Sequence, residues 1–180
     1  MSAGNFKKEN PFFVRAESVG DIQSIRKVNL AAFPGPDEAG LVEKLRSNKS
    51  FVFSFVALMG GEVIGHILFS PVTLEPEQST LRGAGLAPVA VLPEFQRRGI
   101  GSLLIRHGIE QCRKAGYDYI VLLGHPDYYP HFGFVPSVKY NIRCEYDAPV
   151  EAFMILELRT GALAGHSGTI KYLPEFNEVC

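Results

Sequence analysis

The chain has 180 residues, of which 46% are hydrophobic and 21% are charged, and its formal net charge is −1 at pH 7. A chain of this length can bury enough apolar surface for one domain without disulfides or metals. The near-neutral charge argues against a nucleic-acid partner, and the ordinary composition argues against intrinsic disorder. We therefore expect a single domain over residues 12–180, preceded by a flexible N-terminus at residues 1–11.

The cysteine pattern and the apolar runs indicate where the protein works. Cys112, Cys144 and Cys180 are too widely spaced for a metal clasp and odd in number for a disulfide framework, so we expect free thiols in a reducing compartment. No apolar run approaches the roughly 20 residues that span a bilayer, and the N-terminal segment lacks the apolar stretch of a secretory signal. These features predict a cytoplasmic protein with no membrane partner.

The first half of the chain predicts a strand, two helices and a hairpin. Residues 12–16 form a short apolar run typical of a strand, and Ser18 or Asp21 can cap the helix that follows. That helix carries four apolar residues on one face: Ile22, Ile25, Val28 and Leu30. A Pro-Gly-Pro break at residues 34–36 separates it from a second helix beginning near Asp37. Residues 51–59 and 63–70 are rich in β-branched and aromatic side chains and flank Gly60-Gly61, which predicts a hairpin.

The second half predicts a strand, a long helix and a parallel strand. Residues 75–82 read as a loop, and residues 84–91 as a strand that must be bulged or unpaired at Pro88, which has no N–H. Residues 99–115 carry a wide apolar stripe and end at Gly116, which predicts a helix buried against a sheet. Residues 119–123 predict a central parallel strand, joined by a right-handed crossover. Aromatic residues at 127–134 indicate a short helix, and residues 153–158 a further strand.

The turn QRRGIG, from Gln96 to Gly101, is the segment that predicts chemistry. It joins a strand to the start of a long helix, where unpaired backbone N–H groups and the helix dipole favour an anion. Gly99 and Gly101 allow close approach of the backbone, and Arg97 and Arg98 add positive charge, which suits a diphosphate. The turn lacks the Lys-Ser/Thr of a P-loop and the third small residue of a dinucleotide fingerprint.

Residues 89–104, VAVLPEFQRRGIGSLL, resemble the central acyl-CoA motif of the GNAT superfamily of N-acetyltransferases. The resemblance extends from residue 12 to about residue 134. Within it, residues 33–46 and 124–134 are similar to a branch of predicted N-acetyltransferases of unassigned substrate. It implies an α/β (α+β) GNAT fold, with a central mixed twisted sheet of about six to seven strands, splayed after its fourth strand and flanked by about four helices. A monomer or homodimer is the usual assembly in this superfamily.

The resemblance also implies which residues bind the cofactor. Acetyl-CoA would be the co-substrate, with no metal. The main chain of Val89, Ala90 and Val91 would pair with the pantetheine arm like an added strand. The pyrophosphate would be held by the turn and the first residues of the helix: Gln96, Arg97, Arg98, Gly99, Ile100, Gly101 and Ser102.

Acyl transfer to an amine requires a proton donor for the departing thiolate. Tyr129 lies four residues before Gly133, the position where many GNAT members carry the tyrosine that protonates the coenzyme A sulfur, so we expect it to be the general acid. The alternative is that Tyr128, Tyr129, Phe132 and Phe134 are all packing residues. We expect Tyr128 to be a packing residue in either case.

The general base is not assigned by the sequence, because residues 85–91 contain none of the acids that some GNAT members place on this strand. Asp37, Glu38, His66 and His125 remain as candidates, and Asp37, Glu38 and His125 are the expected acceptor-site residues. The two acids could equally be helix caps, and His66 could equally be a satisfied core residue. A substrate amine could also lose its proton through ordered water. His125 and His131 do not match common zinc spacings.

The favoured function is transfer of an acetyl group from acetyl-CoA to an amine of a small molecule or peptide, by direct attack in a ternary complex. No cysteine has a visible activating partner, which disfavours an acyl-cysteine intermediate. A non-catalytic acyl-CoA sensor is the first alternative, since a protein can bind the cofactor without the residues that transfer protons. A scaffold whose turn is purely structural is the second.

Overall fold

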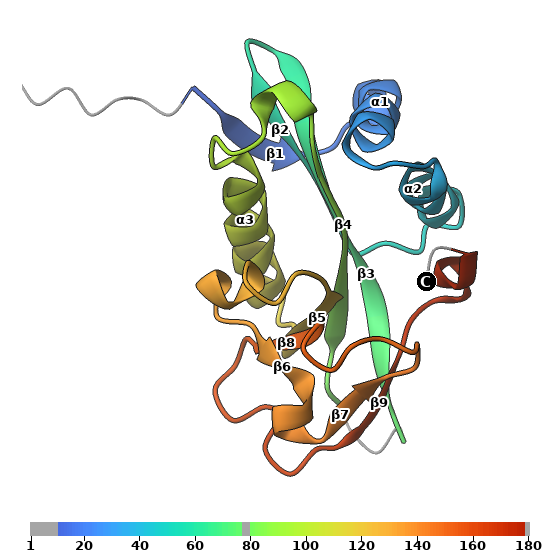
Figure 1. Cartoon of the computed structure of the whole chain (residues 1–180), viewed down its shortest axis with the longest axis vertical. Coiled ribbons are helices and arrows are strands. Elements are labelled where there is room, and N and C mark those ends of the chain that lie inside the picture. Colours follow the sequence, from blue (N-terminus) through green and yellow to red (C-terminus); the bar gives the residue numbers. More distant parts are fainter. Residues whose placement is uncertain (1–10, 77–79, 179–180) are drawn as a thin grey trace, which may run out of the picture.

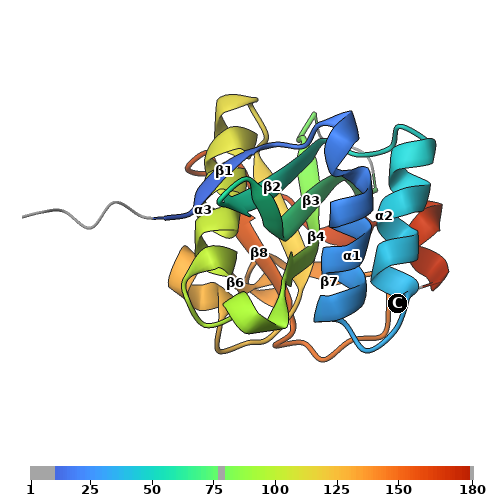
Figure 2. The same cartoon turned by 90° about the horizontal axis from the view of Figure 1, so that it is seen from above.

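A twisted mixed sheet separates two helical layers in the computed structural model, which describes residues 11–76 and 80–178. Helix α3 covers one face of the sheet, and α1 and α2 lie side by side on the other (Figures 1 and 2). The three α-helices are α1 (Ile22–Ala32), α2 (Asp37–Ser47) and α3 (Ile100–Lys114). The strands are β1 (Phe13–Ala16), β2 (Phe53–Met59), β3 (Glu62–Glu75), β4 (Gly83–Val91), β5 (Tyr119–Leu123), β6 (Val135–Pro136), β7 (Ile142–Cys144), β8 (Phe153–Glu157) and β9 (Gly168–Lys171).

The order of the sheet is β1-β2-β3-β4-β5-β8-β6, and β9 joins β3 to β7. The expected hairpin is confirmed as β2 and β3, and the expected strand-helix-strand crossover is confirmed by the parallel pairing of β4 with β5. Helix α3 buries the predicted apolar stripe, including Ile100, Leu104 and Ile105. A Cβ at Gly108 would overlap the Phe69 ring, so this glycine lets α3 approach β3 closely.

The sheet opens beside β4, as the resemblance implied. β4 pairs with β5 only from Gly83 to Gly85, and the two strands part beyond that point. On its other side, the register of β3 and β4 shifts between Ile67 and Phe69, which leaves an irregularity at Ala87-Pro88. The missing N–H of Pro88 therefore lies at the irregularity with β3, three residues beyond the last pair with β5.

Several expectations need correction. Among residues 11–76 and 80–178, the sheet has nine strands instead of six or seven, because the C-terminal third adds the short strands β6, β7 and β9. The described residues contain three α-helices instead of four, since the aromatic segment forms only a 3-10 turn, η3 (Tyr129–Phe132). On α1, Leu30 is exposed and Asn29 is fully buried. Strand β3 runs on to Glu75, beyond the expected end at residue 70.

The C-terminal segment returns to the side of the sheet on which α2 lies. Strand β9 pairs with the end of β3, from Thr73 to Glu75, and η5 (Pro174–Glu178) then lies against α2 (Figure 1). Phe176 is buried in a cluster with Leu41 and Leu45 of α2. Across the described residues, no helix is both long and apolar enough to cross a membrane. The expected flexible N-terminus lies, for residues 1–10, outside the described residues, as does Cys180.

Candidate active site

Two cavities open along β4, where it has parted from β5. The first, the turn cavity, has a volume of about 500 Å³ and is lined by Ala32, Val89, Val91, Phe95, Gln96, Arg97, Gly99, Ile100, Gly101, Ser102, His125, Tyr128 and Tyr129. The second, the aromatic cavity, has a volume of about 460 Å³ and is lined by Phe33, Glu38, Leu41, Leu86, Ala87, Pro88, Val89, Leu123, Gly124, His125, Tyr129, Tyr172 and Phe176. Val89, His125 and Tyr129 line both cavities, so these three residues mark the junction between them.

The turn cavity is built around the start of α3. The backbone is left-handed at Arg97 (φ 57°) and at Gly99 (φ 85°), a geometry that gathers successive N–H groups around an anion. The first helical hydrogen bond runs from the Leu103 amide to the Gly99 carbonyl, at 2.9 Å. The amides of Ile100, Gly101 and Ser102 therefore have no acceptor within the helix and sit at its positive end. A helix start of this kind suits a phosphate group.

The structure brings eight of the ten predicted cofactor residues to the turn cavity: Val89, Val91, Gln96, Arg97, Gly99, Ile100, Gly101 and Ser102. Gln96 braces the turn, because its side-chain amide donates to the Val91 carbonyl at 3.0 Å. The side chain of Ala90 is buried and does not line the cavity, since alternate residues of a strand face opposite sides. Arg98 lies over the Phe95 ring, 5.4 Å from its centre, and is not among the lining residues.

Tyr128 belongs to the turn cavity, although the sequence favoured a packing role. Its hydroxyl oxygen lies 3.3 Å from the Ser102 hydroxyl, and 3.3 Å from where a Cβ at Gly101 would stand. The ring stacks edge-on against Tyr129 and Phe132, at 5.2 Å from each. A half-exposed phenol held beside the anion site is available to donate to a phosphate oxygen. Its placement depends on the fold of η3, which no local sequence pattern specifies.

Tyr129 stands at the junction of the two cavities, held among aromatic rings. Its ring packs edge-on against Tyr128 and Phe134, and a Cβ at Gly124 would overlap it. Gly124 thus leaves the space that this ring occupies. Burial raises the pKa of Tyr129 to about 12, with a smaller contribution from Tyr128. The phenol is therefore protonated at neutral pH and releases its proton only to a strongly basic atom.

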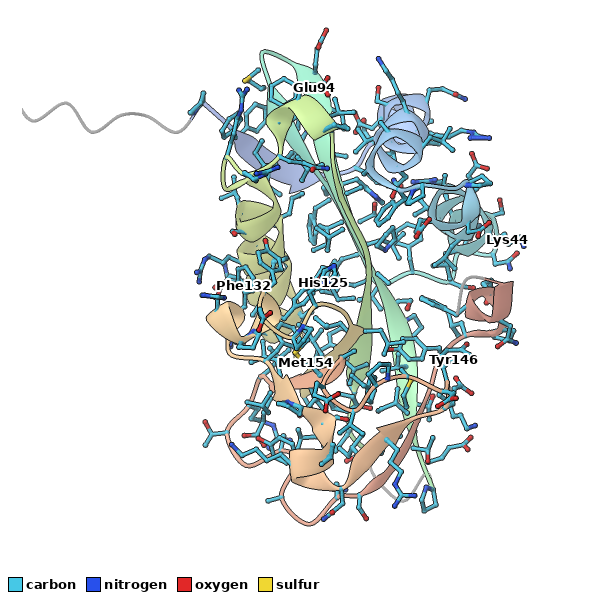
Figure 3. The ribbon with its side chains drawn as sticks, in the orientation of Figure 1. Lys44, Glu94, His125, Phe132, Tyr146 and Met154 are labelled. Carbon is cyan, nitrogen blue, oxygen red and sulfur yellow. The ribbon has the colours of Figure 1, made fainter. Side chains whose placement is uncertain are left out.

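His125 and Glu38 face the aromatic cavity, but Asp37 does not line it. Asp37 and Glu38 are successive residues of α2, so their side chains point about 100° apart, and only Glu38 lines the cavity. His125 is exposed and follows the end of β5, and Figure 3 shows it between α3 and β4. Of the three expected acceptor-site residues, the structure therefore brings two to the site.

His66, a candidate base, is a core residue instead. It is fully buried in β3, where Asn29 Nδ2 lies 3.2 Å from its Nδ1 and Ser54 Oγ lies 2.9 Å from its Nε2. Ser54 also bonds to Glu17, whose carboxylate accepts two hydrogen bonds from Arg46. Desolvation lowers the pKa of His66 to about 3, although the nearby Glu17 charge acts in the opposite direction. A neutral, enclosed imidazole cannot reach either cavity.

The two described thiols, Cys112 and Cys144, line neither cavity. Burial raises the pKa of the Cys112 thiol to about 12 and also raises that of Cys144, so neither is a ready nucleophile. Within residues 11–76 and 80–178, no three His, Cys, Asp or Glu side chains come together as a metal site.

The family model described as "Acetyltransferase (GNAT) family" matches residues 22–134, which cover more than half of the chain and include β4, the turn and α3. The chain belongs to this GNAT family. It is 32% identical over 165 residues to the uncharacterized N-acetyltransferase YhbS of Escherichia coli strain K12, covering 91% of this chain and 98% of YhbS. A second E. coli K12 relative, the uncharacterized N-acetyltransferase YjhQ, is 42% identical over 118 residues, 64% of this chain and 65% of YjhQ.

Solved GNAT structures share the fold and were determined with the cofactor. The crystal structure of E. coli YhbS in complex with CoA superposes with a TM-score of 0.88 at 32% identity, covering 92% of each chain. A GNAT acetyltransferase from Brucella melitensis in complex with acetyl-CoA superposes with a TM-score of 0.75 at 35% identity, covering 92% of this chain and 97% of the other. These similarities make the chain a GNAT N-acetyltransferase in fold and family.

Proposed function

We propose that this protein transfers the acetyl group of acetyl-CoA directly to an amine within a ternary complex, and that residues 12–180 act as one domain. The observation that carries the proposal is the junction of the two cavities at Val89, His125 and Tyr129. A thioester reaching the junction from the turn cavity would meet an amine arriving through the aromatic cavity. The thioester and the amine would thus reach the junction from two different cavities.

The donor half of the proposal rests on the turn cavity. The free amides at the start of α3 and the Arg97 side chain suit the pyrophosphate of acetyl-CoA. From there the pantetheine arm would run along β4, whose edge no longer pairs with β5 beyond Gly85. The CoA and acetyl-CoA complexes of YhbS and the Brucella enzyme support this assignment.

Tyr129 is proposed as the general acid. It lines both cavities and keeps its proton at neutral pH because burial raises its pKa to about 12. When the amine attacks, the new C–N bond forms and the C–S bond breaks, and the departing sulfur becomes basic enough to take the phenolic proton. The tyrosinate regains a proton from solvent before the next cycle.

His125 is proposed as the group that removes the proton from the amine, directly or through one water molecule. Among the candidate bases, it alone lines both cavities, whereas His66 is enclosed and Asp37 lines neither. An ammonium ion must lose a proton before its nitrogen can attack, and the amide product loses a second one. Overall, an ammonium and acetyl-CoA give an N-acetyl amide, CoA with a free thiol, and one proton.

The test is a thiol-release assay with acetyl-CoA over a panel of amines, polyamines, amino acids and peptides, run on the wild type and on Tyr129→Phe. We expect thiol release with at least one amine. Tyr129→Phe should lower kcat by about 10²-fold or more, the usual contribution of a positioned acid, with the Kd for acetyl-CoA unchanged. An unchanged kcat would remove Tyr129 from the mechanism. Tight binding of acetyl-CoA with no turnover across the panel would make the protein a sensor instead of an enzyme.

A further inference from the structure

We propose that the acceptor is a primary monoamine carried on an uncharged, apolar body, preferably an aromatic one, and that the C-terminal segment selects it. This inference rests on the proposed function, because it assigns a substrate class to the same site. The aromatic cavity is the place where the acceptor would bind, and its residues restrict what can bind there.

The walls of the aromatic cavity are mostly apolar. Phe33, at the end of α1, and Leu41 of α2 face residues 86–89 of β4. Tyr172 and Phe176 of the C-terminal segment complete the wall, with ring centres 5.1 Å apart. Cavities with such walls bind ligands mainly by burying their apolar surface. A body with a flat ring fits between side chains of this kind.

The aromatic pair of the C-terminal segment is held in place by the fold. The Tyr172 amide donates to Glu145 Oε1 at 2.5 Å, and its ring lies 5.7 Å from that of Tyr146. Phe176 is only 2% exposed. A wall whose rings are already ordered loses little conformational entropy when a ligand binds.

The charges around the aromatic cavity favour one positive charge on the acceptor. Glu38 is the single carboxylate among its lining residues, and within the described residues this side chain has no ion-pair partner. It is half-buried at the start of α2, where it can receive an ammonium. His125, at the junction, can then accept the proton that the ammonium must lose.

The same lining disfavours two other classes of amine. Among the described residues that line the aromatic cavity, none is a lysine or an arginine. The carboxylate of an amino acid would therefore lose water without gaining a cation. A diamine or polyamine would place its second ammonium against apolar walls, which carries a similar cost.

Tyr172 and Phe176 come from a part of the chain that the family model does not cover. The family model matches residues 22–134, whereas both aromatic residues lie beyond it. Strand β9 brings them to the site by pairing with β3 at Thr73–Glu75. The residues within the family model therefore supply the donor site, and the C-terminal segment supplies part of the proposed acceptor wall.

The experiment compares kcat/KM for four acceptors with acetyl-CoA: 2-phenylethylamine, ethylamine, phenylalanine and 1,4-diaminobutane. Phenylethylamine and ethylamine differ by the ring, and phenylethylamine and phenylalanine differ by the carboxylate. We expect kcat/KM for phenylethylamine to exceed that for each of the others by about tenfold or more. Burial of a phenyl ring gives the advantage over ethylamine, and the unpaired carboxylate of phenylalanine and the second ammonium of 1,4-diaminobutane disfavour those two.

Two variants locate the effect. Glu38→Gln should raise the KM for phenylethylamine about tenfold and leave kcat little changed, whereas Glu43→Gln, on the exposed side of α2, should leave both unchanged. Phe176→Leu keeps an apolar side chain and should reduce the preference for phenylethylamine over ethylamine at least about threefold. The matched control is Phe13→Leu, at an exposed position of β1.

The possible failures are distinguishable. If amines are acetylated but phenylalanine or diaminobutane is preferred, or if the ring makes no difference, the acceptor class is wrong and the acetyltransferase function stands. An unchanged KM in Glu38→Gln would likewise overturn the role of the carboxylate. If no amine on this panel or the wider one releases thiol while acetyl-CoA binds, the proposed function fails and this inference fails with it.

Discussion

Replacing Gly101 with alanine tests the anion site while leaving the helix intact. Gly101 is the second residue of α3, where alanine fits the backbone. Its Cβ would stand 3.3 Å from the Tyr128 hydroxyl oxygen and 3.9 Å from Val91 Cγ2, inside the turn cavity. The added methyl group therefore occupies space in which we place the pyrophosphate of acetyl-CoA.

The expected loss of binding follows from the contacts that the methyl group would displace. Loss of one hydrogen bond to a charged group costs about 1.5–3 kcal/mol. Since about 1.4 kcal/mol corresponds to a factor of ten, the Kd for CoA should rise about 10- to 100-fold. The melting temperature should not fall, because alanine is favoured over glycine in a helix by roughly 0.5–1 kcal/mol.

The assay is calorimetric titration of CoA into the purified variant, with thermal unfolding measured in parallel. The matched control is Gly40→Ala, also a helical glycine, around which a Cβ would meet nothing within 4 Å. Gly40→Ala should bind CoA like the wild type. A wild-type Kd in Gly101→Ala, or an equal loss in both variants, would refute the placement of the pyrophosphate.

Three further predictions concern the junction and the core. Gly124→Ala should push the Tyr129 ring aside and lower kcat at least about tenfold with little change in the Kd for CoA, and a full kcat would show that the ring position is unimportant. Tyr128→Phe should raise the Kd for CoA about two- to fivefold and leave kcat unchanged, whereas Tyr129→Phe should lower kcat and leave the Kd unchanged. A Tyr128→Phe variant that loses only kcat would contradict these separate roles. Burial lowers the pKa of His66 to about 3 in the folded protein, so its imidazole stays neutral between pH 7.5 and 5.5. In the unfolded chain the same imidazole gains a proton over this range, so the free energy of unfolding should fall by about 1 kcal/mol as the pH is lowered from 7.5 to 5.5. Chemical denaturation at both pH values should show a smaller change in His66→Gln, and equal changes would mean that His66 is not the cause.

The donor site could be predicted from sequence because its determinants are local. The turn from Gln96 to Gly101 and the helix after it are contiguous, and their chemistry is that of backbone amides at a helix start. The interruption of β4 at Pro88 could be predicted for a similar reason, since a missing N–H disrupts the ladder wherever the strand lies. The hairpin and the long helix followed from periodicity and glycine placement.

The acceptor site could be predicted only in part, because it depends on contacts between distant segments. Tyr172 and Phe176 reach the acceptor site through the pairing of β9 with β3, and no local sequence pattern predicts that pairing. Asp37 and Glu38 could not be told apart until the rotation of α2 against the sheet was known. His66 could equally have been a base or a core residue, and only its burial beside Asn29 and Ser54 decides for the core.

The central claim is that donor and acceptor meet at Val89, His125 and Tyr129 and react directly. Initial rates measured while both acetyl-CoA and an accepted amine are varied test it most directly. Direct transfer in a ternary complex predicts double-reciprocal lines that intersect, and intact-mass spectrometry with acetyl-CoA alone should find no acetylated enzyme. Parallel lines, together with an acetyl-enzyme that passes its acetyl group to the amine, would contradict the account.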